Sequence, residues 1–589
     1  MKRRQFLQLA ELAGVSAVTL QEVSSAGASD RQPSPKPSAH DTTADILVET
    51  LIAWGAPFVF GVVGDGVNSV IESLRRRQDR IRYIGVRHEE AAAFMASGIA
   101  KHTGRLGVCL GTTGPGAIHL MNGLYDAAFD GAPVVAITGT TFHDLGGTRF
   151  MQGVDTVALM KDVSLYNVAV TGPAHALIVG NQACRFAMGS RGVAHLAIAK
   201  DIQRRAFGED RPSMENHGAR TSSAFSPVAT CPAAAELRAA AEVLNAGHKV
   251  AILVGQGALS ARDEVTQLAD VLAAPVAKAL LGKAVLADDS PFTTGGIGHL
   301  GTEPSEWAMH ACDTLLILGS TMPWIDSYPR PGRARGVQID VNPDRLGLRF
   351  PVEVGLVGDV KTTLSALLPL LHNKADRSFL AEAQEHVRRW NALLERVEST
   401  RRSPLRPQMA IRALSDVLAD DAVISLDCGA NTHFAARHLR LRARQRLTGT
   451  GMLATMGPGL PYAIAAALAY PGRQSVAVVG DGGFAMLMAE MATAVKLKLP
   501  IKIILLKNNS LAEVKFEQKE LGNPEFGCDL SPIDFAAFAE ACGADGFRCG
   551  TPEDLRPVLS AALRSPKPSL VEVSVDVNER PVKPLDLRA

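Results

Sequence analysis

The sequence predicts an α/β protein with three domains, each built on a doubly wound parallel sheet. The chain has 589 residues, which is too many for one ordinary hydrophobic core. From residue 41 onwards, short apolar runs rich in β-branched residues alternate with helical patterns, as in parallel sheets with crossover helices. Polar stretches at 206–230 and 376–407 divide this pattern. The predicted domains are therefore residues 41–205, 230–372 and 407–580.

The strand-like runs support each domain in turn. In the first domain they are PFVFGVVG, RLGVCLGTTGPG, APVVAITG and GVAHLAIAKD. In the second they are KVAILVGQGA, APVAKALLG, CDTLLILGS and RGVQIDVNP, and in the third AVISLDCG, QSVAVVGDGG, IKIILLKNN and PSLVEVSV. Many of these runs end in a glycine turn, where open α/β sheets bind their ligands.

The first 40 residues (1–40) differ from the rest. Arg3-Arg4 precedes Phe6-Leu7, a weakly apolar stretch, small residues at 26–28 and a Pro/Ser segment at 32–39. This order is typical of a twin-arginine export signal followed by a linker. Glu11 and Glu22 depart from it. We therefore expect export to the periplasm, with a charged N-terminus of a cytoplasmic protein as the alternative.

The composition excludes several classes of protein. A net charge of +1 gives no basis for binding nucleic acid or an anionic membrane surface. No apolar run approaches the 18 residues of a membrane span. The eight cysteines are scattered without a CxxC pair, so they indicate isolated thiols rather than a zinc site or a disulfide framework.

Two polar motifs end neighbouring strand-like runs in the third domain. Asp481 stands between Gly480 and Gly482-Gly483 after an apolar run, and Asn508-Asn509 follows the next run. If the two strand ends lie side by side, an aspartate carboxylate and an asparagine carbonyl offer the hard oxygen ligands that Mg²⁺ prefers. The helix that starts after the glycines presents free N–H groups to an anion. The motifs predict a metal–diphosphate anchor, and the alternative is a plain turn and loop.

The spacing of GDG and NN, with a strand, a helix and a strand around them, resembles the thiamine diphosphate (ThDP) motif. A second motif, RHEEAAAF at 87–94, strengthens the resemblance. In ThDP enzymes that look like this one, the glutamate after the histidine of RHE hydrogen-bonds the aminopyrimidine ring and promotes loss of the C2 proton. That glutamate is Glu89 here. The alternative for Glu89 is a helix-entry acid favoured by the helix dipole.

Further segments resemble the pyruvate oxidase group, which includes quinone-reducing pyruvate dehydrogenase and is related to acetolactate synthase. They are GTTGPGAIHLMNGLYDA, GVAHLAIAKDIQ, QIDVNP, LVGDVKTTLSALLPLL and LATMGPGLPYAIAAALAYPGRQ. The resemblance implies a pyrimidine-binding domain (41–205), a central FAD-type, Rossmann-like domain (230–372) and a diphosphate-binding domain (407–580). It also implies a homodimer or homotetramer in which Glu89 faces a cofactor held by Asp481 and Asn509 of the partner subunit.

The same resemblance implies roles for single residues near ThDP. Met456 would prop the cofactor in a bent conformation, and Leu511 would give a backbone carbonyl to the metal. Gly429, Ala430 and Asn431 would lie near the diphosphate. The alternatives are a core methionine at 456 and ordinary turn residues at 429–431.

An FAD site is expected in the central domain, where glycines and acids follow the strand-like runs. The candidates are Gly255, Gly257, Gly298, Gly319, Asp340, Gly358 and Asp359. The segment GSTMPW at 319–324 departs from the quinone-reducing relatives, which have a phenylalanine and a tyrosine beside the proline. A central domain without flavin is therefore the alternative.

The reaction is expected from one position after the NN motif. Acetolactate synthases carry a tryptophan where this chain has Glu517, and oxidases of the group carry glutamate there. The stretch is one residue shorter than the oxidase pattern, and Ala512 and Glu513 stand near a missing glycine. We expect ThDP- and Mg²⁺-dependent decarboxylation of a 2-ketoacid, pyruvate, with oxidation of the enamine intermediate. Acetolactate synthase-like carboligation, a non-catalytic binding protein, and a solvated helix acid at Glu517 are the alternatives.

Overall fold

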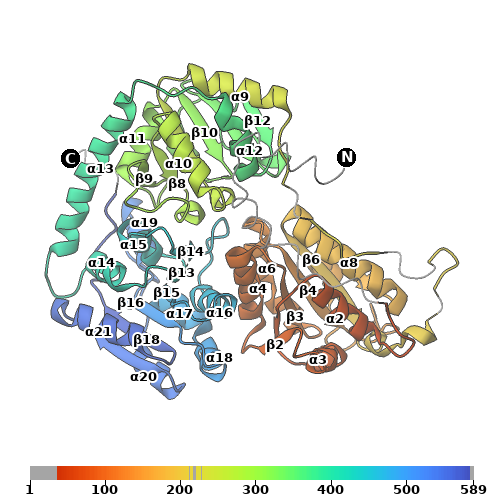
Figure 1. Ribbon diagram of the computed structural model, residues 1–589. Helices are drawn as coiled ribbons and strands as arrows, with labels where there is room; N and C mark the ends of the chain where they lie inside the picture. Colours follow the sequence, from red (N-terminus) through yellow and green to blue (C-terminus); the bar gives the residue numbers. More distant parts are fainter. Residues whose placement is uncertain (1–35, 211, 217–220, 227–228, 584–589) are drawn as a thin grey trace, which may run out of the picture.

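The computed structural model describes residues 36–210, 212–216, 221–226 and 229–583. Its strands form three sheets of six strands each, and every pairing within them is parallel (Figure 1). The predicted fold class is therefore confirmed. The twin-arginine segment lies outside the described residues. Within the described residues, no helix combines the length and apolarity needed to cross a membrane.

The first sheet has the strand order β2-β1-β3-β4-β6-β5. Its strands are β1 (Phe58–Gly61), β2 (Arg82–Gly85), β3 (Gly107–Gly111), β4 (Val134–Thr140), β5 (Tyr166–Val170) and β6 (Val193–Ala199). The helices of this domain are α2 (Thr43–Ala53), α3 (Asn68–Arg75), α4 (Glu89–Thr103), α5 (Pro115–His119), α6 (Met121–Phe129), α7 (Thr156–Leu159) and α8 (Pro173–Ser190).

The second sheet has the order β12-β11-β10-β7-β8-β9. Numbered within the domain and read from the other edge, this is 3-2-1-4-5-6, the order of dinucleotide-binding sheets. The strands are β7 (Val250–Val254), β8 (Val276–Lys278), β9 (Thr293–Gly296), β10 (Thr314–Leu318), β11 (Arg335–Asp340) and β12 (Val354–Val357). The helices are α9 (Ala234–Ala246), α10 (Arg262–Val271), α11 (Glu303–Ala311) and α12 (Val360–Leu367), followed by α13 (Ser378–Ser399).

The third sheet, β14-β13-β15-β16-β18-β17, repeats the order of the first. Its strands are β13 (Val423–Leu426), β14 (Arg446–Thr448), β15 (Ser475–Gly480), β16 (Lys502–Lys507), β17 (Asp545–Cys549) and β18 (Ser569–Ser574). Its helices are α14 (Pro407–Val417), α15 (Ala430–His438), α16 (Gly459–Ala469), α17 (Asp481–Leu487), α18 (Met491–Lys496), α19 (Ala512–Glu520), α20 (Phe535–Ala541) and α21 (Pro552–Arg564).

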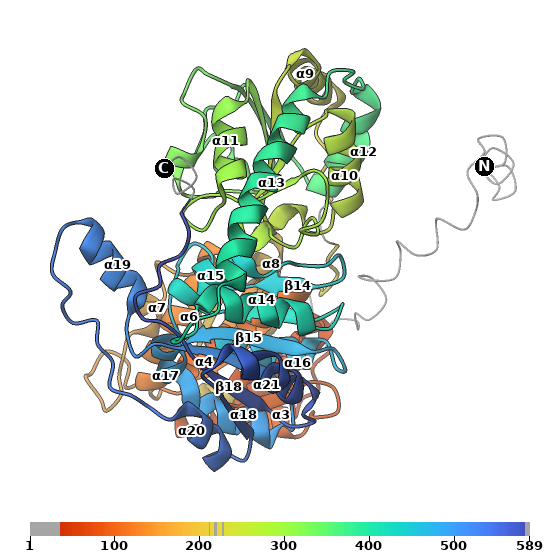
Figure 2. The same cartoon turned by 90° about the vertical axis from the view of Figure 1, so that its left-hand side faces the viewer.

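The first and third domains share one hydrophobic core. Helix α4 packs on α16, and buried residues of both, including Phe94 and Tyr462, belong to the same cluster. The two helices approach closely at Gly98, where a Cβ atom would lie 2.9 Å from the Cβ of Ala465. Helix α13 contacts both α11 of the central domain and α14 of the third, and Figure 2 shows it running between them.

Candidate active site

Asp481 fixes the carboxyl ends of β15 and β16 to each other. These strands are neighbours, and Gly480 pairs with Leu506 in their register. The Asp481 carboxylate accepts hydrogen bonds from the N–H groups of Asn508 (2.9 Å) and Asn509 (2.6 Å). Burial raises the pKa of Asp481, while these N–H groups oppose the rise. The two predicted motifs are thus joined directly.

A cavity of about 90 Å³ opens beside Asp481, and all of its lining residues lie between 407 and 575. The predicted residues that line it are Gly429, Ala430, Asn431, Met456, Gly480, Asp481, Gly482, Gly483 and Leu511. Asn509 is not among them, although its neighbours Asn508 and Ser510 are. We call this cavity the diphosphate pocket.

The residues at the diphosphate pocket fit a metal-bound diphosphate. Asp481, Asn509 and Leu511 would offer a carboxylate, an amide and a main-chain carbonyl, which are ligand types that Mg²⁺ takes together with phosphate oxygens. In the part of the chain that the structure describes, no cluster of three His, Cys, Asp or Glu side chains offers a different metal site. At Gly483 a Cβ atom would lie 2.4 Å from Asp427 Oδ1, so the backbone can pass only as glycine.

Asp427, which the sequence reading missed, holds the wall of this pocket. Its buried carboxylate accepts hydrogen bonds from the N–H groups of Cys428 (2.7 Å), Gly457 (3.0 Å) and Gly459 (3.0 Å). Burial raises its pKa to about 6. Asp427 therefore fixes the turn that follows Met456. The position of Asp427 at the end of the strand-like run AVISLD was the sequence signal that could have indicated this role.

Glu89 begins α4, and its side chain is 9% exposed. Its Oε2 lies 2.9 Å from Nδ1 of His119, whose ring stacks on that of His88. Glu89 does not line the diphosphate pocket of its own chain. His119 lies at the end of the GTTGPGAIH segment, and only the fold brings it to Glu89.

The segment before Glu89 is held by the third domain. The carboxylate of Glu490 accepts hydrogen bonds from the N–H groups of Arg87 (2.8 Å) and His88 (3.1 Å). Glu90 accepts one from Asn122 Nδ2 at 2.7 Å, and Asn122 also donates to Thr455 Oγ1 at 3.0 Å. Glu90 thus has a structural partner, and Glu490 is a positioning residue that no local pattern had indicated.

A second cavity, of about 400 Å³, lies where all three domains meet. Gly255 and Gly319 line it, at the carboxyl ends of β7 and β10, where the strand order of the central sheet reverses. This is the crevice in which such sheets bind dinucleotides. Asp130 of the first domain and Met452 of the third complete the walls, among others. We call this cavity the central crevice.

The other predicted flavin residues lie around the central crevice in different ways. A Cβ atom at Gly257 would lie 2.8 Å from the Cα of Gly319. Gly298 lies against the ring of Trp324, which lines the crevice. Gly257 and Gly298 are thus next to lining residues without lining the crevice themselves, and Asp340, Gly358 and Asp359 are not in its lining either. Asp340 accepts a hydrogen bond from Asn342 N–H, and Asp359 caps α12 through Thr362 N–H.

The two cavities share a wall made of Cys428, Gly429 and Glu513. Glu513 Oε1 lies 3.3 Å from Nε2 of His433, and burial, with Glu517 nearby, raises the pKa of Glu513 to about 7. Burial lowers the pKa of His433 to about 3, so that this ring is neutral at pH 7. Glu517 is exposed on α19 and lines neither cavity of its own chain. The acid of this stretch that lines both cavities is therefore Glu513 and not Glu517. In the sequence, Glu513 stood out only because it lies near the position of a missing glycine.

Comparison with protein families matches all three domains. Residues 41–159 match the thiamine pyrophosphate enzyme N-terminal TPP binding domain, 237–367 the central domain, and 427–573 the C-terminal TPP binding domain. The chain belongs to the thiamine pyrophosphate enzyme family. The predicted resemblance to ThDP enzymes is thereby confirmed, and the two TPP binding domains support thiamine diphosphate as a cofactor.

Individual members of the family are similar along almost the whole chain. A putative thiamine pyrophosphate-containing protein, YdaP, of Bacillus subtilis (strain 168) is 40% identical over 92% of this chain and 93% of its own. Pyruvate oxidase of Lactiplantibacillus plantarum is 32% identical over 92% and 90%. The acetolactate synthase large subunit of Parasynechococcus marenigrum is 28% identical over 90% and 87%.

Proposed function

We propose that this thiamine pyrophosphate enzyme decarboxylates a 2-ketoacid, pyruvate, and passes the electrons of the remaining fragment to a flavin. The observation that carries the proposal is the wall shared by the diphosphate pocket and the central crevice. A cofactor in the pocket and a flavin in the crevice would be separated only by Cys428, Gly429 and Glu513. The similarity to pyruvate oxidase supports the choice of substrate.

Each residue has a role in this proposal. Asp481, Asn509 and the carbonyl of Leu511 would hold Mg²⁺, which would in turn help to hold the diphosphate. Met456 lies in the wall of the pocket, where it would contact the cofactor. ThDP supplies the nucleophilic carbon and stabilises the charge that decarboxylation leaves. Glu89, oriented by His119, holds a proton at the aminopyrimidine ring.

The proposal requires two chains. The diphosphate pocket is lined by the third domain alone, and Glu89 of the same chain is absent from its wall. Glu89 of the partner subunit, in a homodimer or a homotetramer made of such dimers, would complete the site. The first and third sheets have the same strand order, which suits a pseudosymmetric pairing of these domains across a subunit interface.

The central crevice supports FAD for two reasons. The sheet has the dinucleotide-binding order, and the crevice opens at the strand ends where this order reverses. Trp324 follows the proline of GSTMPW, next to which the quinone-reducing relatives carry aromatic residues. Its ring stacks on His299 at a centroid distance of 5.0 Å, so an aromatic surface is retained at this wall.

The test is product analysis with pyruvate, using protein loaded with ThDP, Mg²⁺ and FAD, with an artificial electron acceptor present or absent. Acetate or acetyl phosphate, formed together with acceptor reduction, supports the proposal. Acetolactate as the main product under both conditions contradicts it and identifies the carboligase reaction. Flavin that pyruvate does not bleach in the absence of oxygen also contradicts it.

A further inference from the structure

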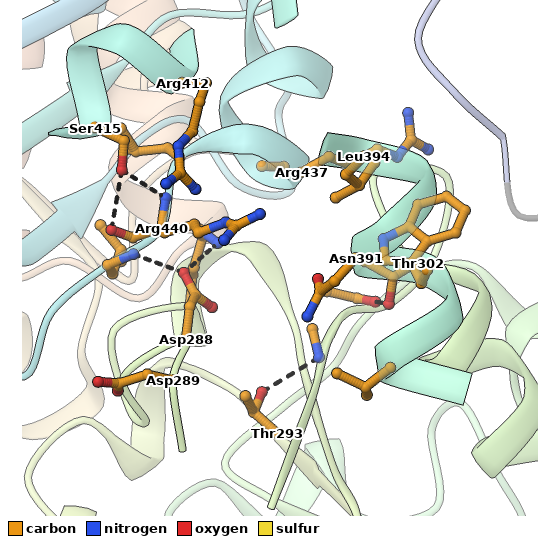
Figure 3. A pocket seen from close by; sticks show the side chains of 18 of the residues that line it. Asp288, Asp289, Thr293, Thr302, Asn391, Leu394, Arg412, Ser415, Arg437 and Arg440 are labelled. Atoms are coloured by element: carbon orange, nitrogen blue, oxygen red, sulfur yellow. Dashed lines mark hydrogen bonds and ion pairs between the residues drawn. The ribbon is translucent and has the colours of Figure 1, made fainter. Parts of the chain in front are cut away.

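A third cavity, of about 340 Å³, lies apart from the candidate active site and shares no lining residue with the other two. It opens between the central domain, α13, α14 and the end of α15 (Figure 3). The central domain contributes Asp288 and the strand β9, and α13 contributes Trp390 and Asn391. We call it the interdomain cavity.

The side chains around the interdomain cavity carry an excess of positive charge. Its cations are Lys283, Arg412, Arg437, Arg440 and Arg442, and its acids are Asp288, Asp289 and Asp416. Two of the three acids are paired with cations, and two of the cations, Arg440 and Arg442, are paired with acids outside the lining (Glu395, Glu398 and Asp420). Asp288 binds Lys278 (2.5 Å) and Lys283 (2.9 Å), and Asp416 lies 3.1 Å from Arg412 Nε.

Asp288 is therefore not a free negative charge in this cavity. Burial raises its pKa, but the two lysines outweigh burial and hold the pKa down at about 2. Its second oxygen also accepts a hydrogen bond from Leu441 N–H at 2.7 Å. All three donors leave this carboxylate little capacity to bind or to repel a further ligand.

Three buried N–H donors from three different elements have no hydrogen-bond partner among the described residues. They are Nε1 of Trp390, Nη1 of Arg412 and Nη2 of Arg440. Trp390 lines the interdomain cavity and is 2% exposed. Leaving such a donor unpaired costs about 1–3 kcal/mol, which a bound acceptor would recover.

Arg412 and Arg440 present their guanidinium groups to the cavity. Figure 3 shows Arg412 reaching from α14 toward Arg440, while Asn391 points in from α13. The backbone around Arg440 is fixed, because Arg440 N–H donates to Ser415 Oγ at 3.0 Å. Its Nη2 lies 3.6 Å from Glu398 Oε2, beyond hydrogen-bonding distance. Nη2 of Arg440 also forms an ion pair with Glu395 Oε1 at 3.7 Å, so it has ion-pair neighbours but no hydrogen-bond partner among the described residues.

We propose that the interdomain cavity is a binding site for a phosphate group, either free or carried by a small metabolite, and that α15 transmits its occupancy to the diphosphate pocket. A ligand that accepts from an indole and from two guanidinium groups must present several anionic oxygens. A tetrahedral phosphate points its oxygens toward α13, α14 and the segment after α15 at once. A planar carboxylate has two oxygens in one plane and cannot meet donors from three directions equally.

Helix α15 connects the two sites. Ala430 and Asn431 at its start line the diphosphate pocket, and Ala436 and Arg437 at its end line the interdomain cavity. The lining residues at the two ends of this helix are five to seven positions apart, which corresponds to about 8–10 Å along its axis. Its last residue, His438, is buried against Glu398 of α13 at 2.8 Å. This link to cofactor binding rests on the proposed function, whereas phosphate binding at the cavity does not.

The first experiment is calorimetric titration of inorganic phosphate into the full-length protein loaded with ThDP and Mg²⁺, which fill the diphosphate pocket. We expect saturable binding. Trp390→Phe keeps the ring and removes the N–H, and Arg412→Gln removes the charge. Each change should raise the phosphate Kd about 10-fold or more, because each removes a charge-assisted hydrogen bond. Trp307→Phe, on α11 and outside the cavity lining, is the matched control and should leave the Kd unchanged.

Each other outcome overturns part of the proposal. The absence of saturable binding overturns the proposed phosphate site. Equal phosphate Kd values in wild type and both cavity variants also overturn it, because phosphate would then bind elsewhere, such as at a substrate position. Acetate binding at least as tightly as phosphate overturns the choice of ligand.

For the proposed link through α15, the Kd of ThDP is measured with and without saturating phosphate. A change of at least about threefold in wild type, lost in Trp390→Phe, supports it, and no change in wild type overturns it. These readouts do not depend on which product pyruvate gives.

Discussion

Lys101 should stabilise the contact between the first and third domains more than any exposed ion pair does. Its Nζ lies 2.9 Å from both oxygens of Asp126 and 2.6 Å from Asp130 Oδ2, and it donates to Tyr462 OH of the third domain at 2.8 Å. The three charged side chains are between 0 and 3% exposed. Lys101→Met would leave two carboxylates buried without their cation. Breaking a buried pair in this way costs about 3–5 kcal/mol.

The matched control is Arg335→Met. Arg335 pairs with Glu353 on the surface, and their side chains are 45% and 50% exposed. Losing an exposed pair costs about 0–1 kcal/mol, because water and salt already screen the charges. The assay is urea unfolding of both variants at pH 8 and at pH 5.5, followed by tryptophan fluorescence.

The pH dependence of the Lys101→Met defect has a definite sign. Burial already raises the pKa of Asp126, and Lys101 opposes that rise. Without the lysine, the Asp126 carboxyl group in the folded protein has a pKa further above its value in the unfolded chain. Such groups favour the folded state when protonated, so stability is lost as the pH rises through the interval between the two values. The defect should therefore be larger at pH 8 than at pH 5.5. A defect at pH 8 no larger than that of Arg335→Met, or one that grows on acidification, would refute the reasoning.

Loss of the Lys101 ion pairs should also affect the candidate active site. Asp130 accepts hydrogen bonds from the N–H groups of Gly451 and Met452, both at 2.9 Å, and Met452 lines the central crevice. If Lys101 no longer holds Asp130, this loop is less well fixed. We therefore expect weaker flavin retention in Lys101→Met than in Arg335→Met.

Four further predictions follow from the site and the N-terminus. Glu89→Gln should retain ThDP but lower turnover about 10²–10⁴-fold, because a positioned proton acceptor is lost, and Glu90→Gln should stay within about tenfold of wild type; similar rates in the two variants would exclude the assignment. Chelation of divalent metal should release ThDP, since the ion bridges the protein to the diphosphate, and calorimetry that finds equal ThDP affinity with and without Mg²⁺ would contradict this. Gly298→Ala should lower the flavin content per chain, because its Cβ would meet the Trp324 ring at 2.2 Å in a backbone conformation with φ of +81°; an unchanged absorbance ratio would argue against a flavin beside Trp324. N-terminal sequencing of protein from the native host should find the leader removed, and Arg3-Arg4→Lys-Lys should block this processing; a chain that begins at Met1 in the cytoplasmic fraction would rule out export.

The sequence alone determined the fold class and the proximity of the Asp481 and Asn508-Asn509 motifs. Both depend on local information, because alternation of apolar strands and amphipathic helices implies crossover connections and a parallel sheet. In the third domain, the strands that carry Asp481 and Asn509 are consecutive and adjacent. The order of these strands along the chain was therefore enough to predict that the two motifs lie side by side.

Residues that act across domains could not be found in this way. Glu490 binds the backbone before Glu89 from about 400 positions away, and His119 reaches Glu89 only after β3 and α5 fold back. In the central domain, Asp359 follows a strand, as a ligand-binding acid would, but its side chain caps α12. A short motif such as GDV is compatible with both uses, and the sequence cannot choose between them.

The order of the strands and the walls of the cavities were decided only by the tertiary structure. Gly255 and Gly319 meet because β7 and β10 pair across the switch of the central sheet, and Glu513 of α19 comes within 3.3 Å of His433 of α15 only in the folded chain. Backbone sterics and the period of apolar residues act over a few residues, so the sequence reveals the elements they set. The arrangement of those elements depends on the summed energy of many small packing contacts between segments that are far apart in the sequence, and no single stretch of sequence specifies that energy.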